Sequence, residues 1–131
     1  MDHQNKRNMR SPLARAIGLG SAKEGAGPWW AARVSAVALV PLTLWFAASI
    51  IAHTGSDYVT FIVWLRTPRA AILMILLLIA LFYHTALGLQ VVAEDYVHSG
   101  VKFAVVIGVR LGCCALATAG VVAILRVALS G

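Results

Sequence analysis

The sequence predicts an all-α integral membrane protein with three transmembrane helices and a basic cytoplasmic N-terminal arm. The chain has 131 residues, of which 60% are hydrophobic and only 12% are charged. A soluble domain averages about 25% charged residues, so the composition alone places the chain in a membrane. Crossing a bilayer takes about 20 apolar residues per helix. The length therefore accommodates three spans and one tail, and leaves no room for a soluble catalytic domain.

The N-terminal arm, residues 1–28, is polar, rich in glycine and basic. Its glycines favour a mostly extended backbone, because glycine gives up the most conformational freedom in a helix. The positively charged residues cluster in this arm and are not spread evenly along the chain. That distribution indicates membrane topology and contact with anionic lipid or a protein surface, and it argues against nucleic-acid binding.

Residues 29–131 form the predicted three-helix membrane anchor domain. Trp29 and Trp30 mark its start, since indole rings prefer the headgroup level. Within loop 53–68, the apolar part 58–65 is too short to cross and is expected to lie along the interface. In the third span, Gly108 and Gly112 suit close helix packing. The three spans are predicted at residues 31–52, 69–93 and 103–125.

The basic residues predict the orientation of the chain. Seven of them fall on the side of the N-terminus: Lys6, Arg7, Arg10, Arg15, Lys23, Arg33 and Lys102. Three fall on the opposite side: Arg66, Arg69 and Arg126. Because cytoplasmic segments carry the excess of lysine and arginine, we expect the N-terminus in the cytoplasm and the C-terminus outside.

A histidine, His84, interrupts the second apolar run, and Asp95 follows eleven residues later. Eleven residues bring a helix back to nearly the same face, about 16 Å further along its axis. A neutral imidazole at membrane depth can be an axial ligand of haem iron, and Gly88, one turn away, would leave room for a porphyrin edge. The alternative is a histidine hydrogen-bonded to a neighbouring carbonyl. As a haem ligand, His84 would need a second ligand from another subunit.

Four polar side chains are predicted to meet at the cytoplasmic membrane surface: Arg33, Ser35, Asp95 and Tyr96. Taken singly, the tyrosine and the carboxylate are ordinary interface residues. Together they suit a quinone site, because a phenol donates a hydrogen bond to a carbonyl and a carboxylate can pass a proton in from water. The arginine could hold the tyrosine or a haem propionate. Arg110, inside the third span, is expected to snorkel to the same surface.

The segment from His84 to Tyr96, HTALGLQVVAEDY, resembles the H-x-x-x-G…D-Y signature of the smaller hydrophobic anchor subunit of succinate dehydrogenase. The arm, with GLGSAKEG at residues 18–25, is similar to that of alphaproteobacterial members. Two tryptophans ahead of the element Arg33-Val-Ser35-Ala also fit, as do the length and the three spans. The resemblance covers about residues 11–128.

The resemblance implies complex II, a succinate:ubiquinone oxidoreductase of the bacterial inner membrane. Its partners would be a second anchor subunit of the cytochrome b556 type, an iron–sulfur subunit and a flavoprotein that oxidises succinate. By position, His84 would be this chain's axial ligand to haem b, Tyr96 the residue that hydrogen-bonds ubiquinone, and Asp95 its acidic neighbour. Arg33 is a further candidate for quinone binding. No succinate chemistry is expected on this chain.

Two other functions are open. The chain could anchor a quinol:fumarate reductase that works in the opposite redox direction; the single membrane histidine and the Asp95-Tyr96 pair favour the succinate type. It could instead be a small transport or structural protein in which His84 is a packing residue. That protein would be colourless and insensitive to Tyr96→Phe.

Overall fold

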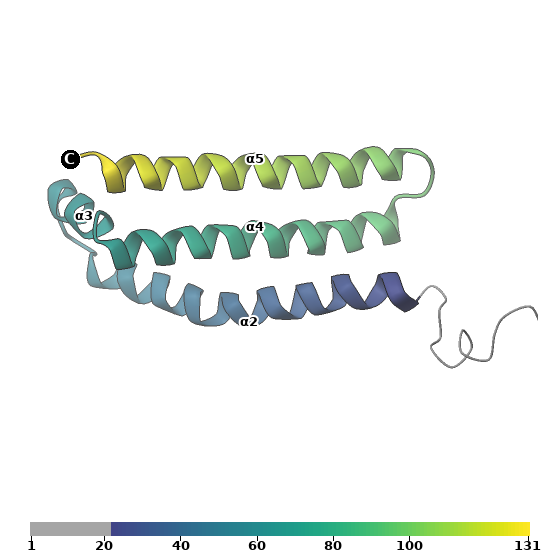
Figure 1. The fold of residues 1–131 in the computed structure, drawn as a ribbon, viewed down its shortest axis with the longest axis horizontal. Helices are drawn as coiled ribbons and strands as arrows, with labels where there is room; N and C mark the ends of the chain where they lie inside the picture. Colours follow the sequence, from purple (N-terminus) through teal and green to yellow (C-terminus); the bar gives the residue numbers. More distant parts are fainter. Residues whose placement is uncertain (1–21) are drawn as a thin grey trace, which may run out of the picture. The chain divides into compact units, whose positions relative to one another are not determined.

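The computed structural model describes the backbone of residues 22–131 and the side chains of residues 27–131. These residues form the helices α2 (Ala22–Ala52), α3 (Tyr58–Leu65), α4 (Pro68–Tyr96) and α5 (Val101–Leu129), without any strand (Figure 1). Three helical segments, Gly27–Ala52 and the whole of α4 and α5, are long and apolar enough to cross a membrane. The predicted all-α class with three spans is confirmed.

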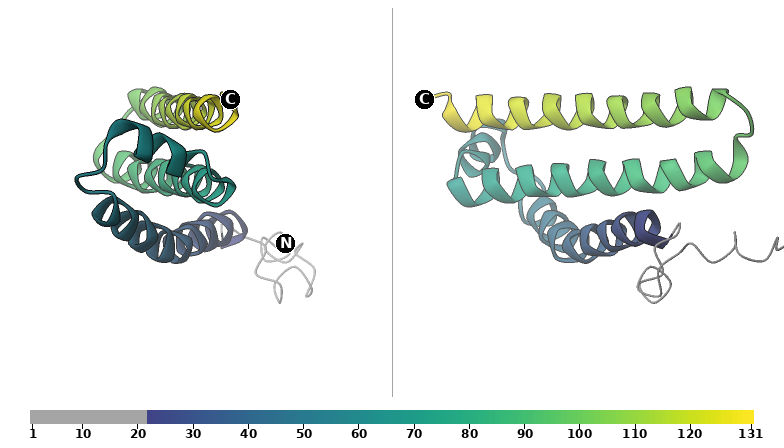
Figure 2. Two further views of the ribbon diagram at one scale, coloured as in Figure 1. Left: turned by 90° about the vertical axis from the view of Figure 1, so that its left-hand side faces the viewer. Right: turned by 45° about the vertical axis from the view of Figure 1, so that its right-hand side comes forward.

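Residues 32–131 form one compact unit in which α4 is the central helix. Figures 1 and 2 show α4 between α5 and the part of α2 that belongs to this unit. Four of the buried apolar residues lie on α4 and one on α5: Ala70, Ala71, Leu77, Ala93 and Ile124. Most other large apolar side chains of the spans are exposed. Such faces suit lipid or another membrane subunit, because neither requires a polar surface.

Helix α2 starts at Ala22, well before the first span predicted at residue 31. The prediction of extended backbone is therefore wrong for residues 22–28, and the rest of the arm lies outside the described residues. Each added helical residue forms one backbone hydrogen bond once a helix exists, and a glycine costs only about 1 kcal/mol. Glycines next to a long apolar helix therefore need not end it. In this segment the rings of Trp29 and Trp30 pack edge to face, with ring centroids 5.1 Å apart.

The apolar segment predicted to lie along the interface is the helix α3, and its aromatic side chains contact the end of α2. Trp64 stacks on Trp45 with ring centroids 6.1 Å apart, and the ring of His53 lies 4.5 Å from that of Trp64. Just after α3, Arg66 donates from Nε to the carbonyl of Val127 at 3.3 Å and from its terminal nitrogen to Ser130 Oγ at 3.2 Å. A cation is thus held at the C-terminus of α5, where the helix dipole favours it.

The start of α3 depends on the ionised carboxylate of Asp57, which accepts a hydrogen bond from the backbone N–H of Thr60 at 3.2 Å. Hydrogen bonds from the Thr60 side chain, and then from its backbone, lower the pKa of Asp57 below 3.8. A lowered pKa means that the cap stabilises α3 above the unfolded pKa and is lost as the pH falls through the folded one. We expect Asp57→Ala to speed amide exchange of Thr60 at neutral pH. In Asp57→Asn, which keeps the cap without a charge, the Thr60 amide should stay protected from exchange in acid.

Helix α5 approaches α4 closely at Gly120, where an added Cβ would lie 2.7 Å from Cδ1 of Leu78. At Gly108 and Gly112 an added Cβ would meet nothing within 4 Å. The glycine pair predicted to support close packing therefore does not do so within this chain. The four-residue spacing of two glycines predicts a flat helix face, but it does not predict which neighbouring helix packs on that face.

Candidate functional site

His84 is held by a buried serine on the neighbouring helix. Ser35 of α2 is 7% exposed, and among residues 27–131 it is the one polar residue that is buried. Its Oγ lies 3.0 Å from Nδ1 of His84 on α4, and the same hydroxyl donates to the carbonyl of Ala32 at 3.0 Å. The partner of His84 is thus a serine hydroxyl, whereas the sequence offered a neighbouring carbonyl as the alternative to iron. This bond engages one ring nitrogen of His84.

The surface next to His84 along α4 is open at Gly88. His84 is itself half-buried, and a Cβ added at Gly88, one turn further along, would meet nothing within 4 Å. No side chain of the described residues therefore packs on the helix surface at Gly88. One imidazole nitrogen with a bare helix surface next to it fits the edge of a haem whose iron takes a nitrogen ligand.

Asp95 and Tyr96 are the last two residues of α4, and both side chains are exposed, Tyr96 by 80%. At about 1.5 Å per residue, Tyr96 lies roughly 18 Å from His84 along the helix axis. The contact between Ser35 and His84 puts Ser35 at the depth of His84 instead. The predicted meeting of four polar residues at one surface is therefore wrong for Ser35. Arg33, which is exposed, lies only about 3 Å along α2 from Ser35.

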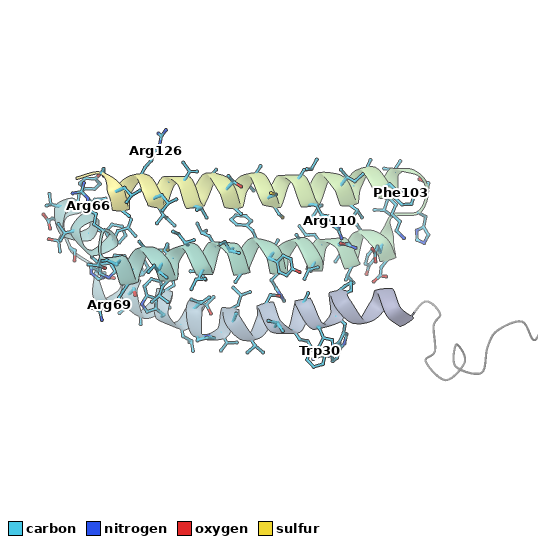
Figure 3. All side chains as sticks on the ribbon, viewed as in Figure 1. Trp30, Arg66, Arg69, Phe103, Arg110 and Arg126 are labelled. Atoms are coloured by element: carbon cyan, nitrogen blue, oxygen red, sulfur yellow. The ribbon has the colours of Figure 1, made fainter. Side chains whose placement is uncertain are left out.

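Arg110 on α5 bonds to α4 rather than simply snorkelling to the surface as the sequence suggested. Its Nε and a terminal nitrogen donate to Oε1 of Gln90 at 3.1 and 2.6 Å, and the Gln90 amide donates to Oε1 of Glu94 at 2.9 Å. Figure 3 shows Arg110 between the two helices, whereas Arg126 points away from α4. Gln90 was not identified from the sequence; it lies six residues before the end of α4, whereas Arg110 lies nine residues after the start of α5.

The described residues contain no cluster of three or more histidine, cysteine, aspartate or glutamate side chains that could hold a metal ion. The structure thus brings Ser35 and His84 together, keeps Asp95 and Tyr96 adjacent at the end of α4, and separates these two pairs along the helix axis.

Comparison with known proteins gives consistent matches over most of the chain. A family model described as succinate dehydrogenase/fumarate reductase transmembrane subunit matches residues 7–125. The succinate dehydrogenase hydrophobic membrane anchor subunit of Rickettsia bellii is 37% identical over 91 residues, 69% of this chain and 72% of the relative. The proteins of the same name from Paracoccus denitrificans and Rickettsia conorii are 33% and 27% identical, covering 83% and 89% of this chain and 85% and 94% of their own. No solved structure gives a significant match.

Proposed function

Since this chain belongs to the succinate dehydrogenase/fumarate reductase transmembrane subunit family, we propose that it binds haem b jointly with a second anchor subunit and helps to form the ubiquinone-reduction site. It is a multi-pass membrane anchor subunit of succinate dehydrogenase and thus part of an oxidoreductase complex made with other subunits. What we propose beyond this is the binding of haem b, the binding of ubiquinone and the roles of individual residues in both.

The observation that carries the haem proposal is the bond between Ser35 and His84 beside the open surface at Gly88. His84 would provide one axial ligand, and the second anchor subunit, of the cytochrome b556 type, would provide the other. When bound, haem b supplies a one-electron carrier inside the membrane. Ser35 holds the imidazole ring, and Gly88 leaves the space that the edge of the macrocycle needs.

The quinone proposal rests on the exposed end of α4. The side chains of Tyr96 and Asp95 are exposed there and make no hydrogen bond with any other residue that the structure describes. Reducing a quinone to a quinol takes up two protons. The Tyr96 hydroxyl would donate a hydrogen bond to a quinone carbonyl, and the Asp95 carboxylate would bring protons from water. Arg33, at a depth between His84 and Tyr96, would supply a cation to the quinone pocket.

The remaining partners and the orientation follow from this assignment. An iron–sulfur subunit would deliver electrons at the cytoplasmic surface of the bacterial inner membrane, and a flavoprotein would oxidise succinate. That oxidation needs a redox cofactor such as flavin, and we place none of it on this chain. The excess of basic residues supports a cytoplasmic N-terminus and a periplasmic C-terminus. The family description also covers fumarate reductase, but the relatives described above bear the name of succinate dehydrogenase.

A reduced-minus-oxidised optical spectrum of the complex isolated from native membranes through a tag on this chain tests the proposal. We expect reduction with dithionite to produce an α-band of the b type. Its intensity should correspond to one haem b per flavin in the complex. A complex that contains all its subunits and reduces ubiquinone but has no such band would remove the haem role from His84. The quinone role of Tyr96 would then stand alone.

A further inference from the structure

The hydroxyl of Ser35 has one proton, and its two contacts determine where that proton points. Ser35 Oγ lies 3.0 Å from the carbonyl oxygen of Ala32 and 3.0 Å from Nδ1 of His84. The serine hydroxyl donates its proton to the Ala32 carbonyl oxygen, which can only accept a hydrogen bond. The contact with His84 is then a hydrogen bond only when Nδ1 is protonated and donates to Oγ.

We propose that Ser35 is a positioning residue that keeps His84 in the tautomer with its proton on Nδ1, so that Nε2 keeps its lone pair for iron. The inference rests on the proposed haem role of His84. In neutral imidazole one nitrogen is a donor and the other an acceptor. In the opposite tautomer, Nε2 would hold the proton and could not coordinate iron, and the serine hydroxyl would have to turn from the Ala32 carbonyl to donate to Nδ1.

Burial makes this arrangement persistent. Ser35 is 7% exposed, and its bond to Ala32 within the same helix fixes its rotamer. Water does not compete for these groups inside a bilayer, and an unsatisfied polar group there is costly. Because the serine is on α2 and the histidine on α4, the packing of the two helices sets the direction of the imidazole ring before any haem is bound.

The bond should also tune the iron. Metal-binding histidines usually donate their other N–H to an acceptor, which fixes the ring and makes the imidazole a stronger ligand. A stronger donor stabilises ferric over ferrous iron and lowers the midpoint potential. Loss of the Ser35 hydroxyl should therefore raise the potential of the haem and weaken its retention, by about 10- to 100-fold in affinity if this serine behaves as other outer-shell partners do.

The test compares four variants of the complex in native membranes: Ser35→Ala, Ser35→Thr, Ser35→Cys and, as a matched control, Ser49→Ala. Haem per flavin, the midpoint potential and the low-spin EPR g-values of the oxidised haem are measured for each. We expect Ser35→Ala to raise the potential, shift the g-values and lose haem during purification. Ser35→Thr, which keeps a hydroxyl, should restore all three to their wild-type values. Ser49→Ala removes a hydroxyl of the same helix that has no contact with His84, and it should resemble the wild type.

Ser35→Cys keeps the inference testable if the alanine variant fails to assemble. Its sulfur fills the same position but accepts hydrogen bonds weakly, so the potential should move upward as well. An assembled Ser35→Ala or Ser35→Cys complex with wild-type potential and g-values would overturn the role of Ser35. If His84→Ala keeps its full haem content, the proposed ligand itself fails. If His84→Ala loses haem while both Ser35 variants stay unchanged, only the positioning role fails.

Discussion

Replacing His84 by alanine is expected to remove haem b from the complex while the chain still inserts into the membrane. The imidazole is the proposed iron ligand, and alanine offers no atom in its place. Changes to groups that merely orient a metal ligand cost about 10- to 100-fold in affinity, so loss of the ligand should cost at least as much. Haem per flavin, measured by pyridine haemochrome in the purified complex, gives the result directly.

The fold should tolerate this change, and the structure shows why. Ser35 keeps its hydrogen bond to the Ala32 carbonyl when the imidazole is gone, so no buried hydroxyl loses every partner. His53→Ala is the matched control: Nδ1 of His53 bonds the Ser49 carbonyl at 2.8 Å, and its ring lies against Trp64 near the other end of the bundle. The control should keep full haem content. Retention of haem in His84→Ala would contradict the assignment, and equal loss in both variants would point to impaired assembly.

Composition and hydropathy predicted three long apolar helices but not the start of α2. The predicted spans 69–93 and 103–125 lie inside the helices Pro68–Tyr96 and Val101–Leu129. These limits follow from the apolar length that a bilayer requires. The start of α2 at Ala22 was missed because glycines next to an established helix weaken it by too little to end it.

The relative register of the helices was the part that the sequence did not reveal. Ser35 falls early in the predicted first span and was therefore assigned to the surface, together with Asp95 and Tyr96. The structure pairs it with His84, because interlocking side chains, and not hydropathy, decide which turn of α2 faces which turn of α4. The partnership of Arg110 with Gln90 was missed for a similar reason: snorkelling satisfies a lone arginine, but an amide on the facing helix does so at shorter range.

Tyr96→Phe is expected to slow ubiquinone reduction by about tenfold while succinate oxidation with an artificial dye stays unchanged. The substitution keeps the ring and removes only the hydroxyl that would donate to the quinone carbonyl. A hydrogen bond that contributes about 1.4 kcal/mol in the transition state corresponds to a tenfold change in rate. Dye reduction takes electrons before they reach the membrane and so reports on the other subunits. The ratio of the two activities in the same preparation is the measured quantity.

Tyr58→Phe provides the control for this experiment, because it removes an equally accessible phenol at the other end of the helix bundle. Tyr58 starts α3 and is 78% exposed, against 80% for Tyr96 at the end of α4. A general effect of losing a surface hydroxyl would appear in both variants, whereas a quinone contact would appear only at Tyr96. Equal loss of dye and quinone activity in Tyr96→Phe would indicate that this end of α4 serves assembly. Normal activity with both acceptors would show that the hydroxyl does not contact the quinone, whatever the haem content of the complex.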